Sequence, residues 1–336
     1  MDSVSNVQRL SGKRSYIAGV IGFILLVISV VYGLYYATAK INYVWRWYKV
    51  PQYIVYHHTE NINSEIEGSV KKIEKNSDHL SITIGSNTEK EVFQIPIEGE
   101  VIVELGDNIY VGDTLGSFKE WRTGMFIQAL WMTLKISIIS TVIGILIGIF
   151  CGIARISSNP FFKWTAATYV EFVRGSPLLV QIFIWYFVIG SIVTKLLRYY
   201  DLPDVGPFWY GVAALSFFTG AYVGEIVRSG IQSIDKGQTE AARSLGMSYF
   251  QCMSYIVLPQ ALRRILPPLA GQFINLIKDS SLLGAISLRE LTQGTREVVS
   301  TNLQFIELWT MCAVLYLTLT FTLSMFLQYL ERRNAI

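Results

Sequence analysis

The residues of this chain that could do chemistry are charged side chains inside long apolar runs. Lys278 and Asp279 are neighbours in the run from Ile265 to Ile286, and Ser280 and Ser281 add two hydroxyl groups directly after them. Charges are costly inside a bilayer, so an ionisable residue within a spanning segment is a functional candidate by default. These four side chains could form ion pairs and hydrogen bonds with a polar solute.

Three further charged candidates lie in or beside apolar runs: Glu225, Lys135 and Arg174. The alternative for all the charged candidates is structural, because they could pair with protein groups and hold the helices together. Arg174 could also anchor the chain at the inner interface, where the Lys/Arg bias places it. Lys135 is expected to extend its amine toward the interface or to face another helix.

The polar segment of about 235–260 carries signals for two short helices around a glycine: Gly237-Gln238-Thr239-Glu240-Ala241-Ala242, then Leu245-Gly246, then Ile256-Val257-Leu258-Pro259. Thr239 is expected to cap the first helix, with Glu240 near the positive end of its dipole. Gly246 suits a chain reversal with positive φ. Ser248 and Gln251 form a capping-box pattern that opens the second helix.

We expect Pro259 to help end that second helix. The small residues Ala241 and Ala242 would let a partner protein approach this segment closely. The alternative is an ordinary amphipathic connector between two spans.

Neither cysteine nor histidine spacing predicts a metal site. Three cysteines are scattered and are expected to pack among apolar side chains: Cys151, Cys252 and Cys312. Three histidines lack acidic or cysteine partners at helical or hairpin spacing, which favours a solvated surface over a metal site: His57, His58 and His79.

Composition favours an integral membrane protein: 51% of residues are hydrophobic and only 16% are charged. The net charge of +3 is too small to argue for nucleic-acid binding, and no block of clustered Lys and Arg forms a basic patch, so we expect no nucleic-acid partner. Six apolar stretches are of the length that crosses a bilayer: Tyr16–Ala37, Met125–Ile153, Leu178–Val193, Phe208–Ile226, Ile265–Ile286 and Ile306–Leu330. The first is too long for a signal peptide and lacks a cleavage site, so we interpret it as a retained anchor.

Lys and Arg in the short loops predict that both termini lie in the cytoplasm. With that orientation the short outer loops hold only four such residues: Lys195, Arg198, Arg289 and Arg296. The inner segments hold many more: Arg9, Lys13, Arg14, Arg155, Lys163, Arg174, Arg228, Lys236, Arg243, Arg263, Arg264, Arg332 and Arg333. The segment from Lys40 to Arg122 is then outside.

This outer segment has the pattern of a small β-domain. From Glu60 to Trp121 it is polar, slightly acidic and alternates with period two between turn signals such as Gly106-Asp107. The run from Val101 to Gly116 resembles the barrel-sandwich hybrid of biotinyl and lipoyl carrier domains. No lysine lies at the tip of a hairpin there, which argues against a carrier role.

The polar loop resembles a family signature. Glu240-Ala241-Ala242, three residues, Gly246, nine residues and Ile256-Val257-Leu258-Pro259 are similar to the ATPase-docking loop of binding-protein-dependent ABC importer permeases. Further motifs narrow the resemblance to polar amino acid permeases of the histidine, glutamine and arginine type: Glu171-x-x-Arg174-Gly175-Ser176-Pro177-Leu178-Leu179-Val180-Gln181, Ala221-Tyr222-x-x-Glu225-x-x-Arg228-x-Gly230-Ile231, Pro259-Gln260-Ala261-x-Arg263, Pro267-Pro268 and Lys278-Asp279-Ser280-Ser281-Leu282. The resemblance covers roughly Trp121 to Arg333; such permeases begin near Arg122 with five spans.

The resemblance, with the spans above, implies an all-α polytopic membrane protein of six transmembrane helices, five of them forming the permease core. The expected domains are 1–40 (cytoplasmic N-terminus and anchor), 41–121 (inserted extracytoplasmic β-domain) and 122–336 (permease core). The implied partners in a bacterial inner membrane are a second permease subunit (a copy or a paralogue), two ATPase subunits and an extracytoplasmic amino-acid-binding protein.

The resemblance also implies roles for the candidate residues. The loop would transmit ATPase closure to the helices through Gly237, Gln238, Glu240, Ala241, Ala242, Leu245, Gly246 and Pro259. The solute would be an amino acid, a zwitterion whose ammonium suits Asp279 and whose carboxylate suits Arg174. Lys278, Ser280, Ser281 and Glu225 complete the expected pathway.

The chain contains no Gly-x-x-x-x-Gly-Lys-Ser/Thr phosphate loop. We therefore expect no catalytic residue and no cofactor on this chain, with ATP and Mg on the partner ATPase. A secondary transporter would share the intramembrane charges but would need no ATPase loop. A membrane-anchored sensor would explain the β-domain but not five further spans. Which amino acid is carried stays open.

Overall fold

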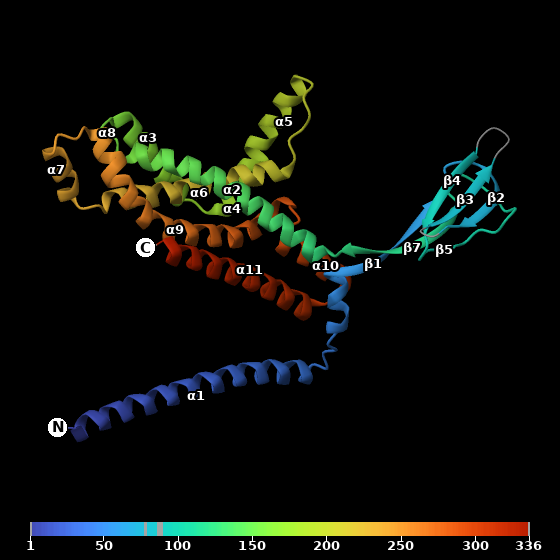
Figure 1. Cartoon of the computed structure of the whole chain (residues 1–336), viewed down its shortest axis with the longest axis horizontal. Coiled ribbons are helices and arrows are strands. Elements are labelled where there is room, and N and C mark those ends of the chain that lie inside the picture. Colours follow the sequence, from blue (N-terminus) through green and yellow to red (C-terminus); the bar gives the residue numbers. More distant parts are fainter. Residues whose placement is uncertain (1, 77–78, 86–89, 335–336) are drawn as a thin grey trace. The chain divides into compact units, whose positions relative to one another are not determined.

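The structure is a computed structural model that describes residues 2–76, 79–85 and 90–334. The chain forms two compact units, one up to Trp47 and one from Tyr48 onward. The first unit is the long helix α1 (Asp2–Lys40), labelled in Figure 1. From Gly19 onward its apolar side chains are exposed within the structure, as expected for a helix that is surrounded by lipid.

A short 3-10 helix, η1 (Trp47–Tyr53), begins at the last residue of the first unit, and the described part of the second unit contains seven strands in two antiparallel sheets. The sheet orders are β1-β7-β5 and β4-β3-β2-β6. Their bounds are β1 Val55–Asn63, β2 Gly68–Lys75, β3 His79–Gly85, β4 Lys90–Pro96, β5 Glu100–Val101, β6 Asn108–Ile109 and β7 Thr114–Thr123. Buried residues from both sheets share one small core: Val70, Ile82, Ile84, Ile95, Ile109 and Leu115.

The remainder is helical. Its α-helices are α2 (Met125–Ile156), α3 (Pro160–Arg174), α4 (Leu178–Phe183), α5 (Gly190–Tyr199), α6 (Pro207–Gln232), α7 (Lys236–Ser244), α8 (Tyr249–Cys252), α9 (Leu258–Asp279), α10 (Leu291–Asn302) and α11 (Phe305–Asn334). Two π-helical turns, Ile184–Ile189 and Met253–Val257, join α4 to α5 and α8 to α9. A 3-10 helix, η4 (Ser280–Ile286), continues α9.

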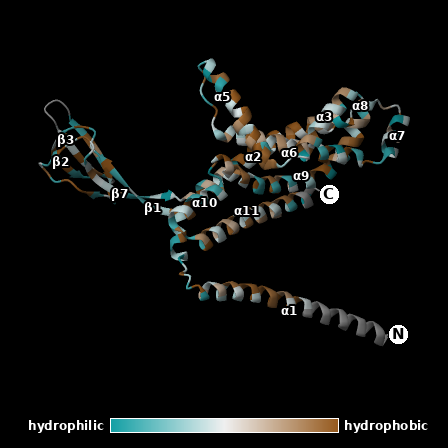
Figure 2. Cartoon of the chain, turned by 180° about the vertical axis from the view of Figure 1, so that it is seen from behind, coloured by the Kyte–Doolittle hydropathy of each residue, from teal (hydrophilic) through white to brown (hydrophobic). Residues whose placement is uncertain are grey.

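Helices α2 and α6 run parallel and pack backbone to backbone, and in Figure 2 hydrophobic residues dominate both. Gly144, Gly148 and Gly152 recur every four residues on α2 and face Thr219, Val223 and Val227 of α6 in the same order. Small residues at such spacing let membrane helices approach closely, where dispersion contacts replace the missing hydrophobic drive. This pair is the rigid centre of the bundle.

A methyl group at Gly148 would lie 2.4 Å from Val223 Cβ and 3.0 Å from the Gly220 carbonyl oxygen. We expect Gly148→Ala to lower the melting temperature of the detergent-solubilised protein, since overpacking costs about 1–3 kcal/mol. Gly22→Ala is the matched control, because a methyl group there meets nothing within 4 Å. Equal melting temperatures for the two variants would contradict the tight α2–α6 contact.

Among the described residues, five helices are long and apolar enough to cross a membrane: Gly19–Lys40, Met125–Ile156, Leu178–Tyr199, Pro207–Gln232 and Phe305–Leu330. The expected stretch Ile265–Ile286 is not among them, because α9 begins earlier, at Leu258, and carries charged residues. Pro267 and Pro268 lie inside α9, which runs through both residues without a break. Helix α3 was not anticipated.

Candidate functional site

The loop between α6 and α9 folds as a compact hairpin of α7 and α8, here called the coupling hairpin (235–257). Its first helix is capped by Asp235, whose carboxylate accepts a hydrogen bond from the Gly237 N–H at 2.6 Å. The expectation that Thr239 is the cap is wrong, because an Asp is already available at the helix start and α7 continues through Gly237. Glu240 consequently lies in the second turn.

Gly246 makes the reversal between the two helices with φ of +81°. Its N–H bonds the Arg243 carbonyl at 3.0 Å, and the Met247 N–H bonds the Ala242 carbonyl at 3.2 Å, which is the Schellman pattern. Ser248 and Gln251 form the expected capping box at the start of α8. The local signals for a turn and a second helix are therefore confirmed.

The coupling hairpin has an inner face and an outer face. Ala242 is buried and packs with Ile234, Cys252 and Val257. The outer face exposes Glu240, Ala241, Gln238 and Gly246 together with large apolar side chains, among them Leu245 (83% exposed) and Phe250 (77% exposed). Exposed apolar side chains at a hairpin tip are more typical of a surface that binds another protein than of a connector that is surrounded by water.

Helix α8 does not end at Pro259. The chain passes through the π turn Met253–Val257 directly into α9, and Pro259 lies in the first turn of α9. A proline costs no hydrogen bond there, because the first N–H groups of a helix have no intrahelical partner. Pro259 thus starts a helix, and the coupling hairpin is joined to α9 without a loop.

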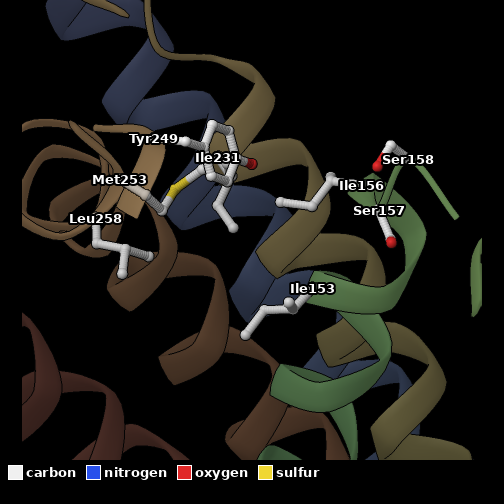
Figure 3. Close-up of a pocket in the computed structure, with 8 residues that line it drawn as sticks. All are labelled: Ile153, Ile156, Ser157, Ser158, Ile231, Tyr249, Met253 and Leu258. Atoms are coloured by element: carbon white, nitrogen blue, oxygen red, sulfur yellow. The ribbon is translucent and has the colours of Figure 1, made fainter. Parts of the chain in front are cut away.

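Beside the hairpin lies a cavity of about 470 Å³ (Figure 3). The ends of α2 and α6 and the α8–α9 corner line it: Ile153, Ile156, Ser157, Ser158, Ile231, Tyr249, Met253 and Leu258. A second cavity of about 510 Å³ shares Ile156, Ile231, Tyr249 and Met253 and reaches Lys236. Open space therefore lies on one side of the hairpin, between it and the helix ends.

A cluster of charges joins three helices. Glu225 of α6 forms ion pairs with Arg155 of α2 and with Arg228 one turn further along α6. The second guanidinium nitrogen of Arg155 lies 3.8 Å from Glu171 of α3. Because the Glu225 carboxylate has two cationic partners in the protein, its position is satisfied without a solute.

Arg174 stacks over the Tyr222 ring, with its guanidinium carbon 5.4 Å from the ring centroid. Lys135 likewise lies over the Phe208 ring of α6, at 5.1 Å. Both cations therefore face a neighbouring helix, and each stacks on an aromatic ring.

Asp279 ends α9 and is half-buried, and Ser280 is fully buried and donates to the Ile277 carbonyl at 2.7 Å. Within the described chain, neither Asp279 nor the exposed Lys278 has an ion pair. Leu276, near Asp279, belongs to the same apolar cluster as Leu215 of α6. Glu225 follows Leu215 on α6 and lies roughly 15 Å beyond it along the helix, at 1.5 Å per residue. The structure does not bring Glu225 to Asp279.

Glu290 was missed by sequence reasoning, and it fixes the segment that follows Asp279. It is fully buried, caps α10 by accepting from the Thr292 and Gln293 N–H groups, and receives the Tyr316 hydroxyl of α11 at 2.9 Å. Burial raises the pKa of Glu290, and the hydrogen bonds from Thr292 and Gln293 oppose that rise. The only available signal was an acidic residue ahead of a helix.

The second missed group is the pair of partners of Glu225. Arg155 was counted only as a topology signal, and Arg228 only as a topology signal and a motif residue, although Glu225 and Arg228 have the i,i+3 spacing of a helical ion pair. In the described part of the chain no group of three His, Cys, Asp or Glu could hold a metal ion.

Residues 144–336 match the family described as binding-protein-dependent transport system inner membrane component. The glutamine transport system permease protein GlnP of Escherichia coli K12 is 38% identical over 212 residues, which cover 63% of this chain and 94% of GlnP. The arginine transport system permease protein ArtQ of Bacillus subtilis is 34% identical over 207 residues, covering 62% and 91%. A crystal structure of an amino acid ABC transporter with histidines matches with 38% identity and a TM-score of 0.55, covering 62% and 94%.

Proposed function

Since the chain belongs to the binding-protein-dependent transport system inner membrane components, we propose that it is the membrane subunit of an ATP-driven importer of polar amino acids. It is a permease and not an enzyme, because ATP hydrolysis in such systems is done by a separate ATPase subunit. The observation that carries the proposal is the exposed apolar tip of the coupling hairpin, which is continuous with α9.

In this proposal the coupling hairpin docks on an ATPase subunit that binds ATP and Mg. Two permease subunits, copies or paralogues, and two ATPases would form the complex, and an extracytoplasmic binding protein would deliver the solute. Closure of the ATPases would push the hairpin, and α9 would move with it because the π turn leaves no loop to absorb the motion. The cavities beside the hairpin support this, since they leave it room to shift.

The proposed pathway follows α9. Its exposed face carries polar or small residues every three or four positions, which suits water better than lipid: Gln260, Arg263, Pro267, Gly271, Asn275 and Lys278. Asp279, Ser280 and Ser281 lie at the end of this helix, where the Asp279 carboxylate, which has no ion pair among the described residues, could receive the ammonium of an amino acid. Arg174 and Glu225 would contact the solute only after leaving Tyr222 and Arg155.

The orientation in this proposal has both termini in the cytoplasm of a bacterium and the strands outside. Helices α2 and α6 then both run inward, as their parallel packing requires. The β-domain would either dock the binding protein or stiffen the outer vestibule. A deletion that leaves binding-protein affinity and transport unchanged would remove both roles.

The function is tested by reconstituting the chain with its ATPase and binding protein in vesicles and following labelled glutamine, histidine and arginine. We expect uptake that requires ATP on the ATPase side and the binding protein on the other side. Uptake that is driven by an ion gradient without ATP would instead identify a secondary transporter.

Asp279→Asn keeps the side-chain shape and removes the charge. If Asp279 receives the solute ammonium, uptake should fall roughly tenfold, the loss expected for about 1.4 kcal/mol, while ATPase assembly stays intact. The measurement is the concentration dependence of uptake in the same vesicles. Wild-type kinetics in Asp279→Asn would exclude the contact, and a loss of folded complex would indicate a structural residue.

A further inference from the structure

An aromatic and cationic segment, residues 40–47, follows the apolar part of α1 and is here called the collar. Three rings occur at alternate positions: Tyr43, Trp45 and Trp47. The Tyr43 and Trp45 rings meet edge to face with centroids 5.3 Å apart, and the Trp45 and Trp47 rings stack at 6.1 Å. The rings therefore form one continuous ladder.

The collar begins where the span ends. Asn42 adopts a left-handed conformation (φ 51°), its N–H bonds the Ala39 carbonyl at 3.1 Å, and the Tyr43 N–H bonds the Thr38 carbonyl at 3.0 Å. This Schellman reversal turns the chain away from the helix axis. The apolar stretch Gly19–Lys40 has 22 residues, about 33 Å of helix, which matches the hydrocarbon thickness of a bilayer. The ladder therefore starts at the depth of the lipid headgroups.

The collar rings are open on one side. Trp45 is 38% exposed, Trp47 is 43% exposed and Val44 between them is 69% exposed. Exposure of such rings to bulk water is unfavourable. Trp and Tyr have a lower free energy at a membrane interface, where the ring lies in apolar surroundings and the polar atom is hydrated.

The charge of the collar also favours contact with the membrane interface. Lys40 extends over the Tyr36 ring at 5.8 Å, at the end of the span. No Asp or Glu occurs from residue 3 to residue 59, so this stretch of the sequence is cationic. Cations are disfavoured on the outer side of a span, and lipid phosphate groups offset this cost.

We infer that the collar is an anchor in the glycerol–phosphate zone of the outer leaflet, with its ring ladder at the hydrocarbon boundary and Lys40 bound to lipid phosphate. The anchor fixes the depth at which the chain leaves the membrane before the strands begin. It depends on membrane insertion and the orientation of α1, and not on transport.

The test is a depth measurement on the full chain without its three native cysteines, in phosphatidylcholine–phosphatidylglycerol vesicles. A nitroxide is attached at Val44→Cys, with Leu26→Cys in the span and Thr59→Cys on β1 as references. Collision with oxygen, compared with a water-soluble nickel complex, reports depth. We expect Val44 to lie between the references, at the level of lipid phosphates.

A second arm tests the rings. Replacing Trp45 and Trp47 together by Ser should raise collision of the Val44 label with nickel several-fold, whereas Trp121→Ser, which removes an exposed ring on β7, should not. A Val44 label that equals the Thr59 label would place the collar in water. A label shielded from both reagents would show that protein covers the rings. Either outcome overturns the inference.

Discussion

Gly246→Asp should abolish ATP-driven uptake while the chain remains in the membrane. Gly246 has φ of +81° at the reversal between α7 and α8, where its N–H bonds the Arg243 carbonyl and the Met247 N–H bonds the Ala242 carbonyl. A non-glycine residue there is strained by about 1–2 kcal/mol, and the new carboxylate would lie on the exposed outer face of the hairpin. Uptake and ATPase recovery in reconstituted vesicles measure the effect, which we expect to exceed tenfold.

Two controls isolate the cause. Gly106 also has a positive φ, +95°, with nothing within 4 Å of an added Cβ, so Gly106→Asp introduces the same strain in the β-domain. Its uptake should persist. Gly246→Asn should retain more uptake than Gly246→Asp, because Asn tolerates the left-handed region and carries no charge. Normal uptake with normal ATPase recovery in Gly246→Asp would refute the docking role of the hairpin.

Glu225→Gln should strongly destabilise the helix bundle. It leaves Arg155 and Arg228 without their shared carboxylate in a largely buried place. Removing one member of a buried ion pair costs about 3–5 kcal/mol, and partial solvent access here reduces that to roughly 2 kcal/mol. A loss of this size lowers the melting temperature by about 4–8 °C in a core of 150–250 residues. Thermal melting in detergent gives the readout.

Arg198→Gln is the matched control, because the Arg198–Asp204 pair at 2.9 Å is exposed on both sides. Exposed pairs contribute little to stability, so its melting temperature should stay close to that of the wild type. If both variants melt alike, the Arg155–Glu225–Arg228 cluster does not hold the bundle. If Glu225→Gln melts normally but fails in uptake, Glu225 belongs to the pathway instead.

The coupling hairpin was predictable to the extent that its signals are local. Gly246 and the Ser248–Gln251 box act within a few residues, and both appear as expected. The start of α7 was placed too late, because Gly237 after Asp235 conceals a helix start that only the hydrogen bond from Gly237 to Asp235 reveals. Pro259 was assigned to a helix end because a π turn that carries the chain onward has no signature in the sequence.

The positions of the helices were less predictable than their existence. Apolarity locates α2 and α6 well, but α3 carries Lys163 and Glu171, so its helix did not stand out. Its place is set by contacts such as the Tyr169 hydroxyl bonding the Phe217 carbonyl at 2.6 Å. The partners of Glu225 also depend on the register of three helices, which no single segment encodes.

The two ends of the strand domain meet where it joins the bundle. The Gly124 N–H donates to the Ile54 carbonyl at 2.7 Å, and Tyr53 packs on Phe126, the second residue of α2. A domain whose entry and exit are neighbours can be inserted into, or removed from, a gene in one event without stretching the host fold. Replacing residues 55–123 by a short turn would delete the strand domain at this junction. A reporter domain could be inserted at the same place.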